Sequence, residues 1–205
     1  MKIETSKELR FYIMADRIMN GFSPNPNGIE KVKELFRPQR HIVKFLYYMR
    51  CLSYHKSKGN SLRMIYYRWL YNKKSLQLGF SIDYNVFSYG LVIPHYGTIV
   101  VGGPNQIGSY AVLHTSTCIA GSGKEIGTAF YLGSGSQCVG ELTLGDNVSV
   151  ASHSLVNKSF ESNVLLAGAP AKIVRSSIVP WYERDGMEYK QRIEKVEKLK
   201  KELNV

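Results

Sequence analysis

The chain has 205 residues, of which 44% are hydrophobic, and a formal net charge of +11. This length and apolar content fit one domain with a packed core and a smaller satellite. Three cysteines without paired or CxxC spacing favour a reduced, cytoplasmic setting over a disulfide framework. We find no apolar signal segment at the start and no apolar run of ~18 residues, so a soluble protein is expected.

Residues 1–79 are expected to form a basic helical region. Thr5 and Glu8 have the spacing of a capping box, which predicts the start of a helix, and the segment 21–28, with two prolines, ends it. Residues 31–79 hold twelve Lys or Arg against a single acid, Glu34. Two further stretches carry apolar residues at helical spacing, namely Ile42, Phe45, Leu46, Met49 and Leu52, and then Leu62, Ile65, Tyr66 and Leu70. We therefore predict several helices before residue 80.

The positive charge of this region has three interpretations. It is a solvated face on helices that pack against one end of the main domain, or a surface that meets anionic lipid or a lipid-linked, phosphate-bearing glycan. Nucleic acid is the third, but no recognised nucleic-acid motif accompanies the charge. We adopt the first interpretation, a solvated face. We keep peripheral contact with a membrane or a lipid-linked glycan as a second interpretation beside it. Nucleic acid is not expected as a partner.

An apolar residue then returns about every six positions. The set is Phe87, Ile93, Ile99, Ile107, Leu113, Ile119, Ile126, Leu132, Cys138, Leu144, Val150 and Val156. Two steps are longer, one of eight residues to Ile107 and one of seven to Ile126. A period of six fits neither a helix nor a lone strand, and it is typical of a β-solenoid in which three flat faces close each coil. Cys138 is then a small core residue.

Three stretches resemble the hexapeptide-repeat acyltransferases, and within them the serine acetyltransferase and polysaccharide O-acetyltransferase branch. They are Ile93–Gly102, the hexad run itself, and Ala167–Val174, which is similar to the AGxPAK-type closing loop. The resemblance covers residues 80–175. It implies a mainly β fold, a left-handed parallel β-helix, and assembly as a homotrimer. Residues 176–205 form a C-terminal helical extension, whose stripe of Ile193, Val196, Leu199 and Leu203 lies along or caps the solenoid, or forms a short coiled coil.

His95 is the candidate catalytic base, because it occupies the position that holds the base in this branch. Acetyl transfer to a hydroxyl requires removal of the hydroxyl proton, and a neutral imidazole suits that task near pH 7. His114 lies one coil later, and neighbouring coils are ~4.8 Å apart. We interpret His114 as an orienting or pKa-tuning partner that contacts the substrate, or as an outward polar residue. His153 is expected to face solvent or a neighbouring subunit.

Departures from the serine acetyltransferase pattern bear on the acceptor. Phe80 and Gly103 occupy positions at which that pattern has acids, and Pro94 occupies a position at which it often has aspartate. The loop that carries a second histidine in that pattern is shortened here to residues 121–125. These changes favour a carbohydrate hydroxyl of the capsule or O-antigen type. The alternative is serine O-acetylation in cysteine biosynthesis. Asp83 is the nearest acid that could orient His95, and with Asn105 it is assigned to the acceptor site.

The resemblance also implies acetyl-CoA as the donor, in a groove between two subunits. Ser134 and Ser152, one coil apart, would line the pantetheine arm. The remaining positions assigned to the donor are Asn157, Lys158, Lys172 and Arg175, the last two near its phosphates or, alternatively, simply solvated.

The sequence also bears on three other functions. A γ-type carbonic anhydrase would bind zinc through histidines, but His95, His114 and His153 lack close ligand spacing, so no metal is expected. A non-catalytic scaffold solenoid is a further alternative. A sugar nucleotidyltransferase is disfavoured because no Gly-rich nucleotide loop precedes the repeats.

Overall fold

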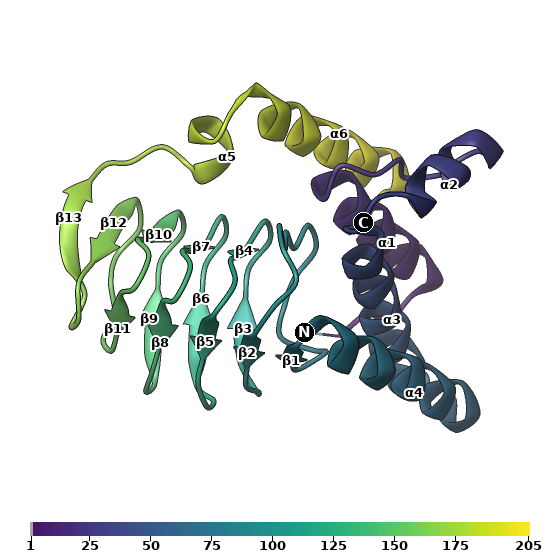
Figure 1. Ribbon diagram of the computed structural model, residues 1–205, viewed down its shortest axis with the longest axis horizontal. Helices are drawn as coiled ribbons and strands as arrows, with labels where there is room; N and C mark the ends of the chain where they lie inside the picture. The colour runs from purple at the N-terminus through teal and green to yellow at the C-terminus, as the bar shows by residue number, and fades with distance from the viewer. Residues whose placement is uncertain (1) are drawn as a thin grey trace.

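In the computed structural model, which describes residues 2–205, four helices pack at one end of a β-solenoid (Figure 1). They are α1 (Ser6–Met19), α2 (Gly28–Leu35), α3 (Arg40–Ser57) and α4 (Ser61–Leu78). The capping box predicted at the start of α1 is confirmed, because the Thr5 side chain accepts from the Glu8 amide at 3.0 Å and Glu8 accepts from the Thr5 amide at 2.9 Å. Asn27 and Glu30 form a second capping box, which begins α2.

Helix α4 does not bury the apolar stripe that the sequence suggested. Leu62 is 84% exposed, Ile65 61% and Tyr66 57%, whereas Tyr71 and Leu78 are buried. The buried side packs on α3 through aromatic contacts, with Tyr71 stacked on Phe45 at 5.1 Å. Apolar residues lie on more than one side of this helix, so helical spacing alone did not identify the side that faces the core.

The solenoid is built from short strands in three parallel sheets. Its strands are β1 (Phe80–Ile82), β2 (Ile99–Val101), β3 (Gln106–Ile107), β4 (Val112–Leu113), β5 (Thr117–Ile119), β6 (Lys124–Ile126), β7 (Tyr131–Leu132), β8 (Gln137–Cys138), β9 (Leu142–Leu144), β10 (Val148–Val150), β11 (Leu155–Val156) and β12 (Val164–Ala167). The strand orders are β1-β2-β5-β8-β11, β4-β7-β10-β12 and β3-β6-β9, and the hairpin strand β13 (Lys172–Ser176) pairs antiparallel with β12 at the end of the second sheet. The parallel β-solenoid predicted from the hexads is confirmed.

The hexad positions form the core of the solenoid. Every apolar residue of the predicted set is at most 5% exposed, including Cys138 at 0%. The longer step 119–126 falls in the loop between β5 and β6, which stacks on the loop between β2 and β3. In the step 99–107, Val101 rather than Ile99 is in register with Ile119, so the two extra residues of that coil lie in the turn 94–98, which carries His95. The irregular steps therefore lengthen two corners and leave the core in register.

The chain then returns along the solenoid to the helical end (Figure 1). Helix α5 (Trp181–Arg184) is followed by α6 (Met187–Leu203), which packs against α1. Val196 is fully buried in a cluster with Phe11 and Ala15 of α1, and Ile193, Leu199 and Leu203 pack beside it. The predicted stripe thus lies against the chain's own N-terminal helix and first coils. Among residues 2–205, no helix is both long and apolar enough to span a bilayer.

Candidate active site

One corner of the solenoid carries His95, the predicted base, and His114, its predicted partner. Strand pairing places Leu113, Leu132, Val150 and Leu166 in register, and the bridge between Val92 and Val112 aligns the preceding coil with them. The turns that follow these positions therefore lie along one edge, which we call the histidine edge. It carries His95, Thr115, Ser134, Ser152 and Gly168, with His95 in a turn two residues longer than the next.

His95 and His114 lie close enough to interact electrostatically. His95 is exposed and His114 is half-buried, with its ring 5.0 Å from that of Tyr131. The pKa of His114 is lowered, first by burial and then by the charge of His95, while Asp185 acts in the opposite direction. His114 is therefore held in its neutral form at neutral pH, next to an exposed imidazole.

Helix α1 holds the backbone that leads to His95. The Asn20 side chain donates to the Leu91 carbonyl at 2.8 Å and accepts from the Ile93 amide at 3.3 Å. On the other side of His95, the Gly97 amide donates to the Leu78 carbonyl at 2.9 Å, and Gly97 has a φ of +134°, which favours glycine. The helical region thus fixes the backbone on both sides of the candidate base.

Asp83 and Asn105 lie at a different corner, the loop edge, formed by the turns after β1, β2 and β5. The Asp83 carboxylate accepts from the Asn85 amide at 2.9 Å. Asn105 is 4% exposed; its amide donates to the carbonyls of Gly102 and Gly121, and it accepts from the Lys124 amide. Within one subunit, Asp83 is not placed to orient His95, because a full sheet face separates the two corners. The contacts of Asn105 stabilise the stacked loops.

The residues assigned to the donor are spread over three parts of the solenoid. Ser134 is half-buried and Ser152 exposed on the histidine edge, and the His153 amide donates to the Ser134 carbonyl at 2.9 Å. Asn157 and Lys158 are exposed after β11, on the side of the loop edge. Lys172 and Arg175 are exposed on β13, at the far end. One subunit therefore does not bring all six into a single groove.

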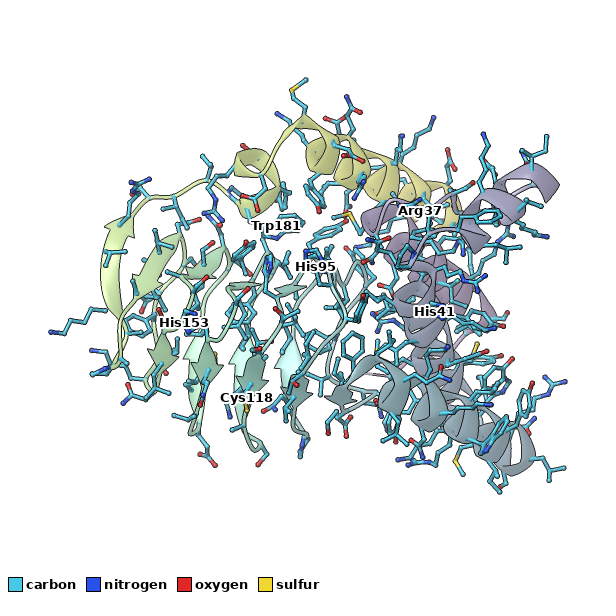
Figure 2. All side chains as sticks on the ribbon, viewed as in Figure 1. Arg37, His41, His95, Cys118, His153 and Trp181 are labelled. Carbon is cyan, nitrogen blue, oxygen red and sulfur yellow. The ribbon has the colours of Figure 1, made fainter. Side chains whose placement is uncertain are left out.

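A segment after the solenoid, Trp181–Asp185, covers the sheet beside the histidine edge, and we call it the strap. Trp181 is 1% exposed and donates to the Tyr110 carbonyl at 2.8 Å. Arg184 lies over the Tyr131 ring at 5.5 Å and contacts the Ser149 hydroxyl at 3.4 Å. Figure 2 labels Trp181 above and to the left of His95 in the view, with His153 farther along the solenoid.

In the part of the chain that the structure describes, no group of three or more His, Cys, Asp or Glu side chains is placed to hold a metal ion.

Sequence and structure comparisons agree on the relatives of this chain. No protein-family model matches it. Serine acetyltransferase from Buchnera aphidicola subsp. Acyrthosiphon pisum (strain APS) is 30% identical over 132 aligned residues, and the match covers 55% of this chain and 48% of that protein. Serine acetyltransferase 2 from Arabidopsis thaliana is 34% identical over 94 aligned residues, and the match covers 42% of this chain and 29% of that protein. The chain thus spans about half the length, or less, of these curated relatives.

Solved structures share the fold. A Neisseria gonorrhoeae serine acetyltransferase in complex with serine has a TM-score of 0.60 at 19% identity, covering 82% of this chain and 69% of that one. The enzyme from Brucella abortus strain S19 has a TM-score of 0.58 at 18% identity, covering 83% and 69%. The chain therefore shares the β-solenoid fold of these enzymes, and part of its sequence is similar to serine acetyltransferases.

The strap is the part of the candidate site that sequence reasoning missed. Asp185 influences His114, and Tyr131 packs against its ring. The available signal was the run Trp181–Asp185, which places two aromatic residues beside three charged ones and contains one of only two tryptophans. The hexad pattern ends before this run, so the pattern could not assign it to a face of the solenoid.

Proposed function

We propose that this chain is an acetyl-CoA-dependent O-acetyltransferase in which His95 is the general base. The observation that carries the proposal is the pairing of exposed His95 with half-buried, neutral His114 on one edge of a solenoid shared with serine acetyltransferases. Sequence relatives that carry this activity support the same reaction class.

The chemistry follows from an imidazole beside a thioester. His95 accepts the proton of the acceptor hydroxyl as its oxygen attacks the acetyl carbonyl carbon, and the C–S bond to CoA then breaks. The imidazolium returns the proton to the departing sulfur. His114, being neutral, adds no second positive charge beside the imidazolium, and its ring nitrogens remain available to bond the acceptor.

The donor site requires more than one subunit in this proposal. Ser134 and Ser152 would contact the pantetheine arm, while Asn157, Lys158, Lys172 and Arg175 would supply polar and basic groups for the rest of CoA. Because these residues lie on different parts of one subunit, we propose a homotrimer in which the histidine edge of one copy faces the loop edge of the next. Asp83 and Asn105 would then belong to a neighbour's side of the site.

We propose serine as the acceptor. The carbohydrate acceptor expected from the sequence has no support among the relatives, which are serine acetyltransferases, and one structural neighbour was solved with serine. Peripheral membrane contact likewise has no support from them. The departures at Phe80, Gly103 and the loop 121–125 remain, so the acceptor needs a direct test.

That test is a competition assay. The protein is incubated with acetyl-CoA and either serine or a panel of surface glycan fragments, and products are identified by mass spectrometry. O-acetylserine should form, and His95→Ala should slow its formation ~10²–10⁴-fold while CoA still raises the melting temperature. Acetylation of a glycan without serine would restore the carbohydrate acceptor. Absence of any CoA effect would favour a non-catalytic scaffold.

A further inference from the structure

Two adjoining clefts lie in the helical region, away from the histidine edge. The first, of about 520 Å³, is lined by residues from α1 to α4 and from the segment between α1 and α2. The second, of about 570 Å³, shares Leu35, Arg40 and His41 with the first and reaches Tyr96. The two clefts share part of their walls, and the proposed acetyl transfer uses neither of them. Figure 2 labels Arg37 and His41 in this part of the molecule.

The charged side chains of the first cleft are mostly cationic. The lining cations are Arg17, Lys31, Arg40, Lys44 and Lys74, together with His41. Two acids also line it, but both already have arginine partners: Glu34 lies 2.5 Å from Arg17, and Asp16 lies 2.8 Å from Arg50. Among residues 2–205, no ion pair joins Arg40, Lys44 or Lys74 to an acid.

These cations are close to one another. The Lys74 ammonium lies 3.2 Å from His41 Nδ1 and donates to Gln77 Oε1 at 2.7 Å. The pKa of His41 is lowered by burial and then by the charges of Lys74, Arg40 and Lys44. Burial also lowers the pKa of Lys74, followed by the charges of Lys44 and Arg40. Helices α3 and α4 thus hold like charges together, and an anion placed among them would relieve their repulsion.

The cleft is larger and less polar than a bare inorganic anion needs. Phe22, Pro24, Leu35 and Val43 contribute apolar wall, and Tyr47 a ring beside the cations. Several convergent cations suit a group with more than one negative charge, and guanidinium and ammonium groups form strong charge-assisted bonds to phosphate. Apolar walls would contact the organic part of the same molecule.

We propose that this cleft binds a phosphate-bearing organic ligand, with the phosphate held by Arg40, Lys44 and Lys74. The site is distinct from the donor positions, which follow β7, β10 and β11 or lie on β13, and it does not depend on the proposed acetyl transfer. Because the adjoining cleft reaches Tyr96, the residue after His95, a ligand that extends into it would lie next to the candidate base.

Sodium pyrophosphate is the probe, titrated calorimetrically at fixed ionic strength so that general screening stays constant. We expect saturable binding of one pyrophosphate per subunit. Lys74→Gln and Lys44→Gln should each weaken binding at least about tenfold, because each removes one charge-assisted bond. The matched control is Lys195→Gln, which makes the same charge change on an exposed position of α6 and should bind like wild type. Unsaturable binding, or equal weakening in the Lys195→Gln variant, would overturn the proposal.

A second arm separates a free phosphate compound from a lipid headgroup. Vesicles of phosphatidylcholine, with or without phosphatidic acid, are sedimented with the protein. Retention that needs phosphatidic acid, is lost in Lys74→Gln and is competed by pyrophosphate would identify a headgroup as the source of the phosphate. Binding to pyrophosphate without vesicle retention would identify a soluble ligand. If wild type and Lys74→Gln are retained equally by the vesicles and neither binds pyrophosphate, the retention comes from general surface charge. That result would refute the site.

Discussion

The Arg50 guanidinium and the Asp16 carboxylate form a buried ion pair, with 2.8 Å between Arg50 Nε and Asp16 Oδ2 and 3.3 Å between Nη2 and Oδ1. Both side chains also bind the first coil. Arg50 donates to the carbonyls of Phe87 and Ser88, and Asp16 accepts from the amides of Gly90 and Leu91. Two helices thereby hold the backbone that leads to the candidate base, so this pair joins the stability of the helical region to the geometry of the site.

Asp16→Asn should lower the free energy of unfolding by about 3–5 kcal/mol, because it leaves the Arg50 charge buried without its counter-charge. Urea denaturation at pH 7 measures the loss. Glu34→Gln is the matched control: it also removes an acid from an arginine pair, but with side chains 17% and 19% exposed rather than 2% and 2%. The control should lose no more than about 1 kcal/mol. Equal losses would show that the buried pair does not hold the coil.

His95→Ala should raise the pKa of His114, because it removes the charge that helps to depress it. Asp185→Asn should lower the same pKa further, because Asp185 opposes the depression. NMR titration of the imidazole resonances measures both shifts, with His153→Ala, on the same edge but two coils farther along, as the control. If the pKa of His114 is the same in wild type and His95→Ala, the two rings are not neighbours in solution.

The same depressed pKa makes stability depend on pH. The pKa of folded His114 lies below its unfolded value of ~6.5, so the unfolded chain binds the proton more readily. The stability that neutral His114 contributes to the folded state is therefore fully present above about pH 6.5. It is lost as the pH falls from the unfolded pKa through the lower, folded pKa. His114→Gln should flatten the fall in melting temperature on acidification from about pH 7 to pH 5. An unchanged pH profile would assign the acid sensitivity to other groups.

The sequence predicted the solenoid well because its core has a period that no other element shares. The six-residue period correctly placed core residues such as Ile107, Leu132 and Val156, since each occupies the same position on a flat face of the solenoid. Spacing failed where several sides of an element are apolar, as on α4, where Leu62 and Ile65 face outward. It also could not place Asp83, because closeness to His95 in the sequence does not say which corner of the coil a residue occupies.

A homotrimer is expected from the division of the site between corners. Sedimentation or light scattering should give about three times the 23.2 kDa mass of one chain. Mixing His95→Ala subunits with subunits mutated on the opposite wall, such as Lys158→Gln, should restore some activity, because mixed trimers contain interfaces that carry neither change. A fully active monomer at assay concentration would contradict a shared site.

Trp181→Ala should loosen the strap and act on the candidate site from outside it. The indole is 1% exposed, packs against Tyr189 at 5.0 Å and donates to the Tyr110 carbonyl, so its removal should cost about 3–5 kcal/mol of stability. Hydrogen exchange should accelerate at the amides of α5. Among the described residues of that short helix, only Trp181 is buried. Withdrawal of Asp185 should also lower the pKa of His114, as Asp185→Asn does.

The control for the strap is the other tryptophan. Trp69 is 58% exposed on α4, so Trp69→Ala should change stability by no more than about 0.5 kcal/mol and leave α5 protection intact. A Trp181→Ala protein that is destabilised but keeps wild-type exchange at α5 and an unchanged His114 pKa would show that the indole stabilises the core alone. A change in both readouts, at a temperature where the variant remains folded, would show that the strap sets the electrostatic surroundings of His114, because Asp185 reaches that ring only while Trp181 holds α5 against the solenoid.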